Sequence, residues 1–81
     1  MIKLTLYSRP ECHLCEAFLA DLMPLLDTNV VVETVDVDLS VALERRYGLR
    51  IPVLTAGELE LSGYPLDRER VQRYLASNQA D

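Results

Sequence analysis

The sequence predicts an α/β fold with the element order β-α-β-α-β-β-α, in which helices cover a mixed sheet of four strands. Three observations support this prediction. Segments with alternating or β-branched apolar residues occur between segments in which apolar residues recur every three or four positions. A strand, a helix and a second strand open the chain, which makes the two strands parallel with a right-handed crossover. A short connection that contains glycine separates the last two strands, which should therefore form an antiparallel hairpin.

The first strand and the first helix follow from the spacing of apolar residues. Residues 2–7 alternate between apolar and polar side chains, which is typical of a strand. After a turn, apolar residues recur at helical spacing: Leu14, Phe18, Leu22 and Leu25. The helix should begin around Cys12. Pro24 has no backbone N–H, so the helix should end between Met23 and Leu26.

The second strand and the second helix are marked by β-branched residues and by helix-end signals. Residues 30–37 are rich in β-branched side chains and predict a strand. Asp38 or Ser40 can cap the next helix, and Gly48 can end it in a left-handed conformation. The apolar stripe of this helix is expected at three positions: Leu39, Leu43 and Tyr47.

The closing hairpin and the last helix complete the order. Residues 53–55 and residues 58–61 should form the two strands, with the turn at Ala56-Gly57 and the glutamates facing solvent. Asp67 is placed to cap a third helix, and Leu66 can form a hydrophobic staple with Val71 inside that helix. The apolar positions of that helix are Val71, Tyr74 and Leu75.

The composition is that of an ordinary globular protein and argues against several partners. The chain has 81 residues, which we expect to form one domain spanning residues 1–81, and 49% of them are hydrophobic. The formal net charge is −5, so a nucleic-acid or anionic membrane surface is not expected. The longest apolar stretches fall far short of the roughly 20 residues that a transmembrane helix needs. The N-terminus begins directly with a strand pattern and not with a signal peptide, so we expect a cytoplasmic protein.

The two cysteines, Cys12 and Cys15, point to redox chemistry or metal binding rather than to a disulfide framework. Residues three apart on a helix share a face and are within reach of a disulfide. Cys12 would stand at the helix N-terminus, where backbone N–H groups and the helix dipole stabilise a thiolate and lower the pKa of the thiol. Arg9 is the nearest candidate cation, whereas Glu11 and Glu16 should oppose the lowering.

These positions predict a redox cycle and leave other uses of the cysteines open. The exposed Cys12 would attack a disulfide, and Cys15 would then attack Cys12 and release the reduced product. The pair can also be two neighbouring cysteines without chemistry. A closed zinc site needs four ligands, and beyond these cysteines and His13 the chain has no further Cys or His, so we expect no metal site within one chain. An iron–sulfur cluster shared between two chains stays open.

At this point the chain resembles a known family. The strand, the run from Tyr7 to Cys15, the run from Tyr47 to Leu54, and the terminal hairpin and helix look like the thioredoxin fold in its short, glutaredoxin form. The resemblance covers essentially the whole chain. It implies a thiol–disulfide oxidoreductase with a cis Ile51–Pro52 bond facing the thiols, and an Ile51 backbone that can pair with a peptide or with glutathione.

The resemblance also suggests which residues would hold glutathione, as a co-substrate and not as a tightly bound cofactor. The candidates for this or another substrate are Arg9, His13, Arg50, Ile51, Pro52, Gly63 and Asp67. The chain departs from the family pattern in three places. His13-Leu14 stands where glutaredoxins usually have Pro-Tyr, and Arg50-Ile51 where they have Thr-Val. Residues 62–67 replace the usual Gly-Gly turn, with Pro65 removing one N–H donor.

Each of these candidates also has a plain structural explanation. His13 can be an exposed residue at a helix start, Arg50 a solvated arginine, and Asp67 a simple helix cap. Three arginines close to Pro52 could form a positive rim that favours an anionic thiol such as glutathione, or could only offset the helix dipole: Arg45, Arg46 and Arg50.

The expected partner is a disulfide-containing protein or a glutathione mixed disulfide, acted on by a monomer. Two alternatives stay open. One is a non-enzymatic thioredoxin-fold module that binds a partner or carries a shared cluster. The other is a thioredoxin-like reductase that receives electrons from a reductase and not from glutathione.

Overall fold

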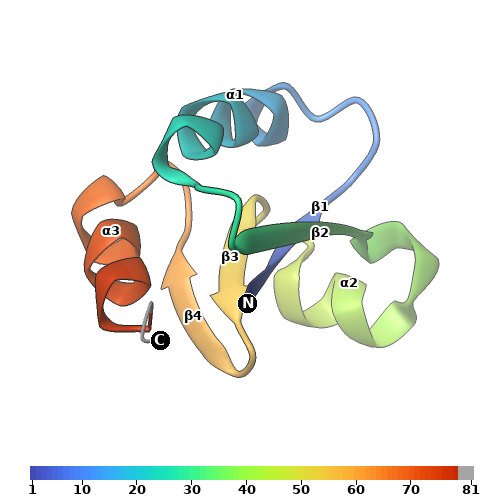
Figure 1. The fold of residues 1–81 in the computed structure, drawn as a ribbon. Helices are drawn as coiled ribbons and strands as arrows, with labels where there is room; N and C mark the ends of the chain where they lie inside the picture. The colour runs from blue at the N-terminus through green and yellow to red at the C-terminus, as the bar shows by residue number, and fades with distance from the viewer. Residues whose placement is uncertain (79–81) are drawn as a thin grey trace.

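The computed structural model describes residues 1–78 and has the predicted order of elements, as Figure 1 shows. The strands are β1 (Ile2–Ser8), β2 (Val30–Asp36), β3 (Val53–Ala56) and β4 (Leu59–Ser62). The helices are α1 (His13–Leu22), α2 (Val41–Tyr47) and α3 (Arg68–Ser77). Two short 3-10 helices, η1 (Met23–Leu25) and η2 (Val37–Leu39), follow α1 and β2. The predicted α/β fold class is confirmed.

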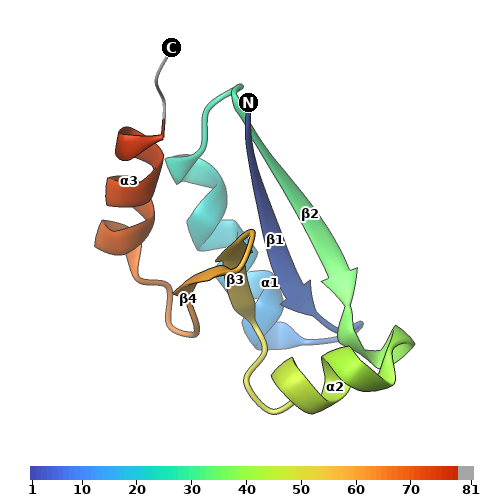
Figure 2. The ribbon, with the colours of Figure 1, turned by 90° about the horizontal axis from the view of Figure 1, so that it is seen from below.

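The four strands form one mixed sheet in the order β2-β1-β3-β4. β1 runs parallel to β2 and antiparallel to β3, and β3 runs antiparallel to β4. Figure 2 shows β1 and β2 side by side with the same direction, while α2 lies beyond their C-terminal ends. The crossover from β1 to β2 goes through α1, as a parallel pair requires.

The larger core lies between one face of the sheet and the helices α1 and α3. Alternate residues of β1, namely Ile2, Leu4 and Leu6, point into it. Phe18 from α1 and Val71 from α3 are fully buried against them. This alternation with period two is the one that the sequence predicted for the first strand.

A smaller core covers the opposite face of the sheet under α2. It contains Val37, Tyr47 and Val53, all buried. Tyr7, which lies between the inward residues of the larger core along β1, stacks on Tyr47 with ring centroids 4.1 Å apart and 15° between the ring planes. The two faces of β1 therefore belong to two different cores.

One of the two predicted caps of α2 is confirmed, whereas Leu39 and Gly48 at the ends of the helix differ from the prediction. Ser40 is the cap, and its Oγ accepts the Leu43 N–H at 3.3 Å. Leu39 lies before the helix, in η2, and is 84% exposed, so it does not belong to the buried stripe. Gly48 ends the helix in a right-handed conformation, with φ −55°, and not in the left-handed one expected. This position needs a glycine because there is no room for a side chain: a Cβ would lie 2.5 Å from the Glu44 carbonyl oxygen.

The hairpin turn lies one residue later than predicted. Ala56 pairs with Leu59, so the turn residues are Gly57 and Glu58, and Gly57 adopts the positive φ of 62° that a two-residue hairpin turn requires at its first position. The register shifts by a bulge at Leu54 and Thr55. The prediction of a turn at Ala56-Gly57 was wrong. The first turn position is the one that needs a positive φ, and Gly57 occupies it, so Ala56 remains in β3.

No helix in the part described here, residues 1–78, is long and apolar enough to cross a membrane.

Candidate functional site

The two cysteines stand at the start of α1 and are joined in a disulfide. Cys12 is the N-cap and has extended backbone angles, while Cys15 lies in the first turn, with 5.2 Å between the two Cα atoms. Cys12 is half-buried, whereas Cys15 is only 6% exposed. The Cys15 N–H donates a hydrogen bond of 3.1 Å to the Cys12 Sγ. The more accessible sulfur is thus also the sulfur that receives an N–H from the helix start.

The chain reaches this helix start through an unusual backbone conformation. Glu11 has a φ of 60°, which costs a residue with a side chain about 1–2 kcal/mol relative to glycine. The Glu16 N–H then donates to the Cys12 carbonyl at 3.0 Å, the first bond of the helix. The turn at Glu11 therefore sets the direction in which Cys12 enters α1.

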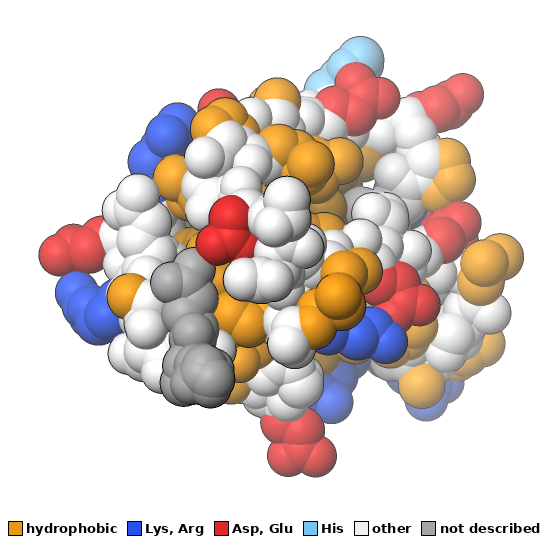
Figure 3. Space-filling view, viewed as in Figure 1, with side chains coloured by type: hydrophobic (Ala, Val, Ile, Leu, Met, Phe, Trp, Pro, Cys, Tyr) orange, Lys and Arg blue, Asp and Glu red, His pale blue; other side chains and the backbone are white. Residues whose placement is uncertain are grey.

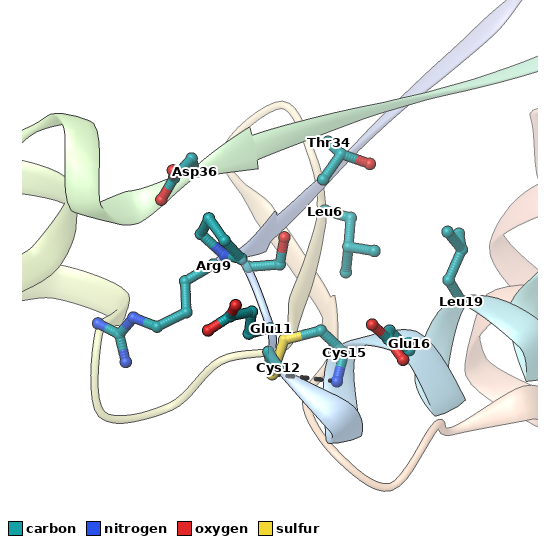
Figure 4. A pocket seen from close by; sticks show the side chains of 11 residues that line it. Leu6, Arg9, Glu11, Cys12, Cys15, Glu16, Leu19, Thr34 and Asp36 are labelled. Atoms are coloured by element: carbon teal, nitrogen blue, oxygen red, sulfur yellow. Dashed lines mark hydrogen bonds between the residues drawn. A yellow bond between two sulfur atoms is a disulfide. The ribbon is translucent and has the colours of Figure 1, made fainter.

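A hollow of about 350 Å³ opens beside the disulfide, between α1 and the ends of β1 and β2 (Figure 4). Its apolar lining includes Leu6 and Leu19, and both cysteines contribute to it. The remaining lining residues are mainly polar or acidic: Ser8, Arg9, Pro10, Glu11, Glu16, Thr34 and Asp36.

Arg9 lines this hollow, but its guanidinium group is directed away from the sulfurs and toward α2 (Figure 4). It donates to Asp38 at 3.1 Å, to Glu44 at 2.7 Å and to the Gly48 carbonyl at 3.4 Å. The hydrogen bond that Arg9 donates to the Asp38 carboxylate is the main cause that raises the pKa of Arg9 above its ordinary value. Arg9, which the sequence suggests as the cation nearest to Cys12, thus has its charge neutralised by two carboxylates.

The Ile51–Pro52 peptide bond is cis and immediately precedes β3. Pro52 is buried, and Ile51 packs against the smaller core. The ladder between β1 and β3 ends at the pair Tyr7 and Val53, so Ile51 lies outside it. A second cis bond, Tyr64–Pro65, was not expected from the sequence.

The arginines near Pro52 gather over an aromatic ring. Arg46 and Arg50 lie over Tyr47 at 5.3 and 5.5 Å from the ring centroid. Arg50 also donates to Glu60 at 3.0 Å and to the Arg46 carbonyl at 3.3 Å. Much of the positive rim predicted here is therefore held by contacts within the chain.

Gly63 and Asp67 lie together in a second hollow of about 310 Å³, between β4 and the start of α3. The Ser62 Oγ donates to the Gly63 carbonyl at 2.7 Å and accepts the Asp67 N–H at 2.9 Å. Asp67 caps α3 by accepting the Arg70 N–H at 3.1 Å. A capping role for Asp67 is thus observed directly.

The single histidine of the chain, His13, is exposed at the first position of α1. In Figure 3 the histidine side chain, in pale blue, stands at the outer surface of the molecule. The structure therefore divides the candidate residues. Arg9 shares a hollow with the cysteines, Gly63 and Asp67 share another, and neither hollow is lined by the rest: His13, Arg50, Ile51 and Pro52.

Residues 1–78 contain no group of three or more His, Cys, Asp or Glu side chains placed to hold a metal ion.

Sequence reasoning missed several residues of the hollow beside the disulfide. Ser8 follows Leu4 and Leu6 in the alternation of β1, and this signal places it on the same face as the core. Asp36 pairs with Ser8 in the parallel register of β1 and β2. No local signal gives that register, because it depends on how the crossover helix packs.

Comparisons with known proteins agree with this geometry. The model of one protein family, described as Glutaredoxin-like domain (DUF836), matches residues 3–76. A protein from Nitrosomonas europaea solved by NMR is 37% identical, with a TM-score of 0.81 and coverage of 90% of this chain and 89% of that one. An X-ray structure of a protein from X. campestris is 36% identical, with a TM-score of 0.73 and coverage of 91% and 96%.

Thioredoxin 1 from Thermosipho africanus is 16% identical, with a TM-score of 0.61 and coverage of 98% of this chain and 100% of that one. At this identity the likeness concerns the fold alone. No curated protein matches the chain.

Proposed function

This chain belongs to the family of glutaredoxin-like domains, and we propose that its Cys12–Cys15 pair works as a thiol–disulfide oxidoreductase. The thioredoxin-like fold and the cysteine pair at the start of α1 support a redox function. The proposal adds the order of the steps and the role of each sulfur.

In the proposed cycle, the reduced protein acts on a substrate disulfide. The Cys12 thiolate attacks one substrate sulfur, forms a mixed disulfide and releases the other substrate sulfur as a thiolate. Cys15 then loses its proton and attacks the Cys12 Sγ, which closes the Cys12–Cys15 disulfide and releases the second substrate thiolate. The substrate gains two electrons and two protons. Two thiols of a reductant, glutathione or a dithiol protein, then reduce the pair again.

The observation that carries this proposal is the difference between the two sulfurs. Cys12 is the more accessible one, and its Sγ receives the Cys15 N–H at 3.1 Å. A hydrogen-bond donor and the positive helix end both favour the thiolate over the thiol. Cys15 is 6% exposed, so an incoming disulfide reaches Cys12 first.

The substrate-binding part of the proposal concerns the residues around Pro52. An extended substrate segment could pair with the backbone of Ile51, which lies outside the strand ladder. Glutathione as co-substrate and action as a monomer belong to the same proposal. So does a cytoplasmic location, where the surrounding thiols are reduced.

The Cys15→Ser variant tests the order of attack. With 2-hydroxyethyl disulfide it should accumulate a stable mixed disulfide at Cys12, because the resolving sulfur is missing. Mass spectrometry of the intact protein and of its peptides would locate the adduct. Cys12→Ser is the matched control and should form far less adduct, because its remaining thiol is buried. An adduct that forms equally fast on Cys15 in the control would contradict the assignment of Cys12 as nucleophile.

A further inference from the structure

The hollow beside the disulfide combines an apolar lining with an excess of negative charge. Three carboxylates line it: Glu11, Glu16 and Asp36. None of them forms an ion pair with a described residue. Arg9 is the cation of the lining, and its guanidinium group is already bound to Asp38 and Glu44. The field beside the sulfurs is therefore negative.

Ser8 provides a second and independent observation. Its side chain is on the core face of β1 and lines the same hollow, and the residue is only 7% exposed. Its hydroxyl group makes no hydrogen bond with any residue in the described part of the chain. The hydroxyl group lines the hollow and keeps its hydrogen-bonding capacity, so it is available to a ligand group that enters there.

We propose that this hollow is a substrate subsite that takes an ammonium or guanidinium group carried close to the disulfide being reduced. Such a group can donate hydrogen bonds to the Ser8 Oγ while Glu11 and Glu16 neutralise its charge. The apolar lining by Leu6 and Leu19 accommodates the carbon chain between that charge and the substrate sulfur. A volume of about 350 Å³ is at the lower end of the range for small-molecule pockets.

This subsite selects among substrates by charge. A disulfide with a carboxylate near its sulfurs is repelled by the same negative charges and should be reduced more slowly. The inference rests on the proposed redox function, since the subsite acts on the disulfide that Cys12 attacks. It adds no step and no electron carrier to the cycle given above.

The test compares three small disulfides that differ in charge: cystamine, 2-hydroxyethyl disulfide and dithiodiglycolic acid. The protein is reduced, freed of reductant and mixed with each disulfide, and its oxidation is followed by acid quench and mass spectrometry. Each rate constant is divided by that of dithiothreitol with the same disulfide, which removes differences in intrinsic reactivity. We expect the normalised rate to be highest for cystamine and lowest for dithiodiglycolic acid, with a smaller spread at high salt.

Variants assign the preference to the hollow. Glu11→Gln and Glu16→Gln should each lower the ratio of the cystamine rate to the neutral rate by roughly two- to fivefold, the effect of one charge at a few ångströms in water. Glu58→Gln is the matched control. It removes an exposed carboxylate in the β3–β4 turn that also has no ion pair among the described residues, and it should leave the ratio unchanged.

Ser8→Ala tests whether the hydroxyl group contributes to substrate preference or to the stability of the fold. Because the hydroxyl has no partner within the described chain, its loss should leave the free energy of unfolding in urea unchanged or higher, while the cystamine ratio falls. A ratio that stays at the wild-type value in Ser8→Ala and in both glutamine variants of the hollow would overturn the subsite.

Two peptide disulfides distinguish the source of the charge. One carries lysine and the other glutamate next to the cysteine. Preference for cystamine alone assigns a small amine disulfide, and preference for the lysine peptide as well assigns a basic protein segment. Equal normalised rates for all charges, with 2-hydroxyethyl disulfide still reduced, would reject the subsite and keep the proposed function. No reduction of 2-hydroxyethyl disulfide would reject both.

Discussion

Gly48 shows at the residue scale how packing can require a glycine that the backbone angles do not. Its φ of −55° suits any residue, but a Cβ there would lie 2.5 Å from the Glu44 carbonyl oxygen and would also meet the Glu44 side chain. The Glu44 carboxylate accepts a hydrogen bond from the Arg9 guanidinium, which also donates to the Gly48 carbonyl. A side chain at residue 48 would therefore disturb the contact that joins the turn before α1 to α2.

Replacement of Gly48 by alanine should destabilise the protein by about 1–3 kcal/mol, the usual cost of forcing atoms into filled space. The free energy of unfolding in urea, followed by circular dichroism, measures the effect. Gly63→Ala is the matched control, because a Cβ at Gly63 meets nothing within 4 Å, and it should change stability by less than about 0.5 kcal/mol. Equal effects of the two variants would show that space around Gly48 is not the cause.

Single residues could be predicted from the sequence where their partners are close along the chain. Cys12 and Cys15 are such a case, since their relation depends on one helical turn. The contacts of Arg9 could not be predicted, because Asp38 and Glu44 are 29 and 35 residues away and meet Arg9 only after the fold forms. Ser8 could be assigned to a face, but the hollow that it lines depends on the β1–β2 register.

At the scale of elements, the helices begin where the sequence provides a capping side chain. Ser40 caps α2 and Asp67 caps α3, both through the hydrogen bond that the sequence suggested. The strand ends were predicted less well, since β3 and β4 are short and a bulge shifts their register. A bulge inserts one extra residue into one strand, and nothing local in these four-residue strands marks its position.

Asp67→Ala should destabilise α3 and lower the free energy of unfolding by about 1 kcal/mol, the usual value of an N-cap. Asp67→Asn keeps an acceptor for the Arg70 N–H and should change stability by only a few tenths of a kcal/mol. Thermal and urea unfolding of both variants provide the measurement. A loss in Asp67→Asn as large as in Asp67→Ala would show that the carboxylate charge, and not the cap, is what α3 needs.

At the scale of the whole molecule, two cores share one thin sheet. The larger core under α1 and α3 contains most of the buried side chains, and the smaller one under α2 is built around Tyr47. Both could be outlined from the alternation along β1, where inward residues and Tyr7 fall on opposite faces. The sequence does not predict which helix covers which face of the sheet, because this depends on the crossover and on contacts between residues far apart in the chain.

Phe18→Ala should remove much of the stability of so small a protein. Phe18 is fully buried in the larger core, and its truncation should cost about 3–5 kcal/mol. Domains of this size have only about 5–15 kcal/mol in total. Leu39→Ala, at an 84% exposed position, is the control and should cost less than about 0.5 kcal/mol. Urea unfolding compares the two, and a small effect of Phe18→Ala would show that this core is not what holds the fold together.

The position of β1 in the sheet has a consequence for synthesis of the protein. β1 is made first, yet it lies between β2 and β3, and residues 53–62 supply the other half of the sheet. Until those residues have left the ribosome, β1 has an unpaired edge on the side of β3, and the larger core lacks its α3 wall. The sheet can therefore close only after residues 53–62 have been made, and until then the unpaired edge of β1 can pair with another chain.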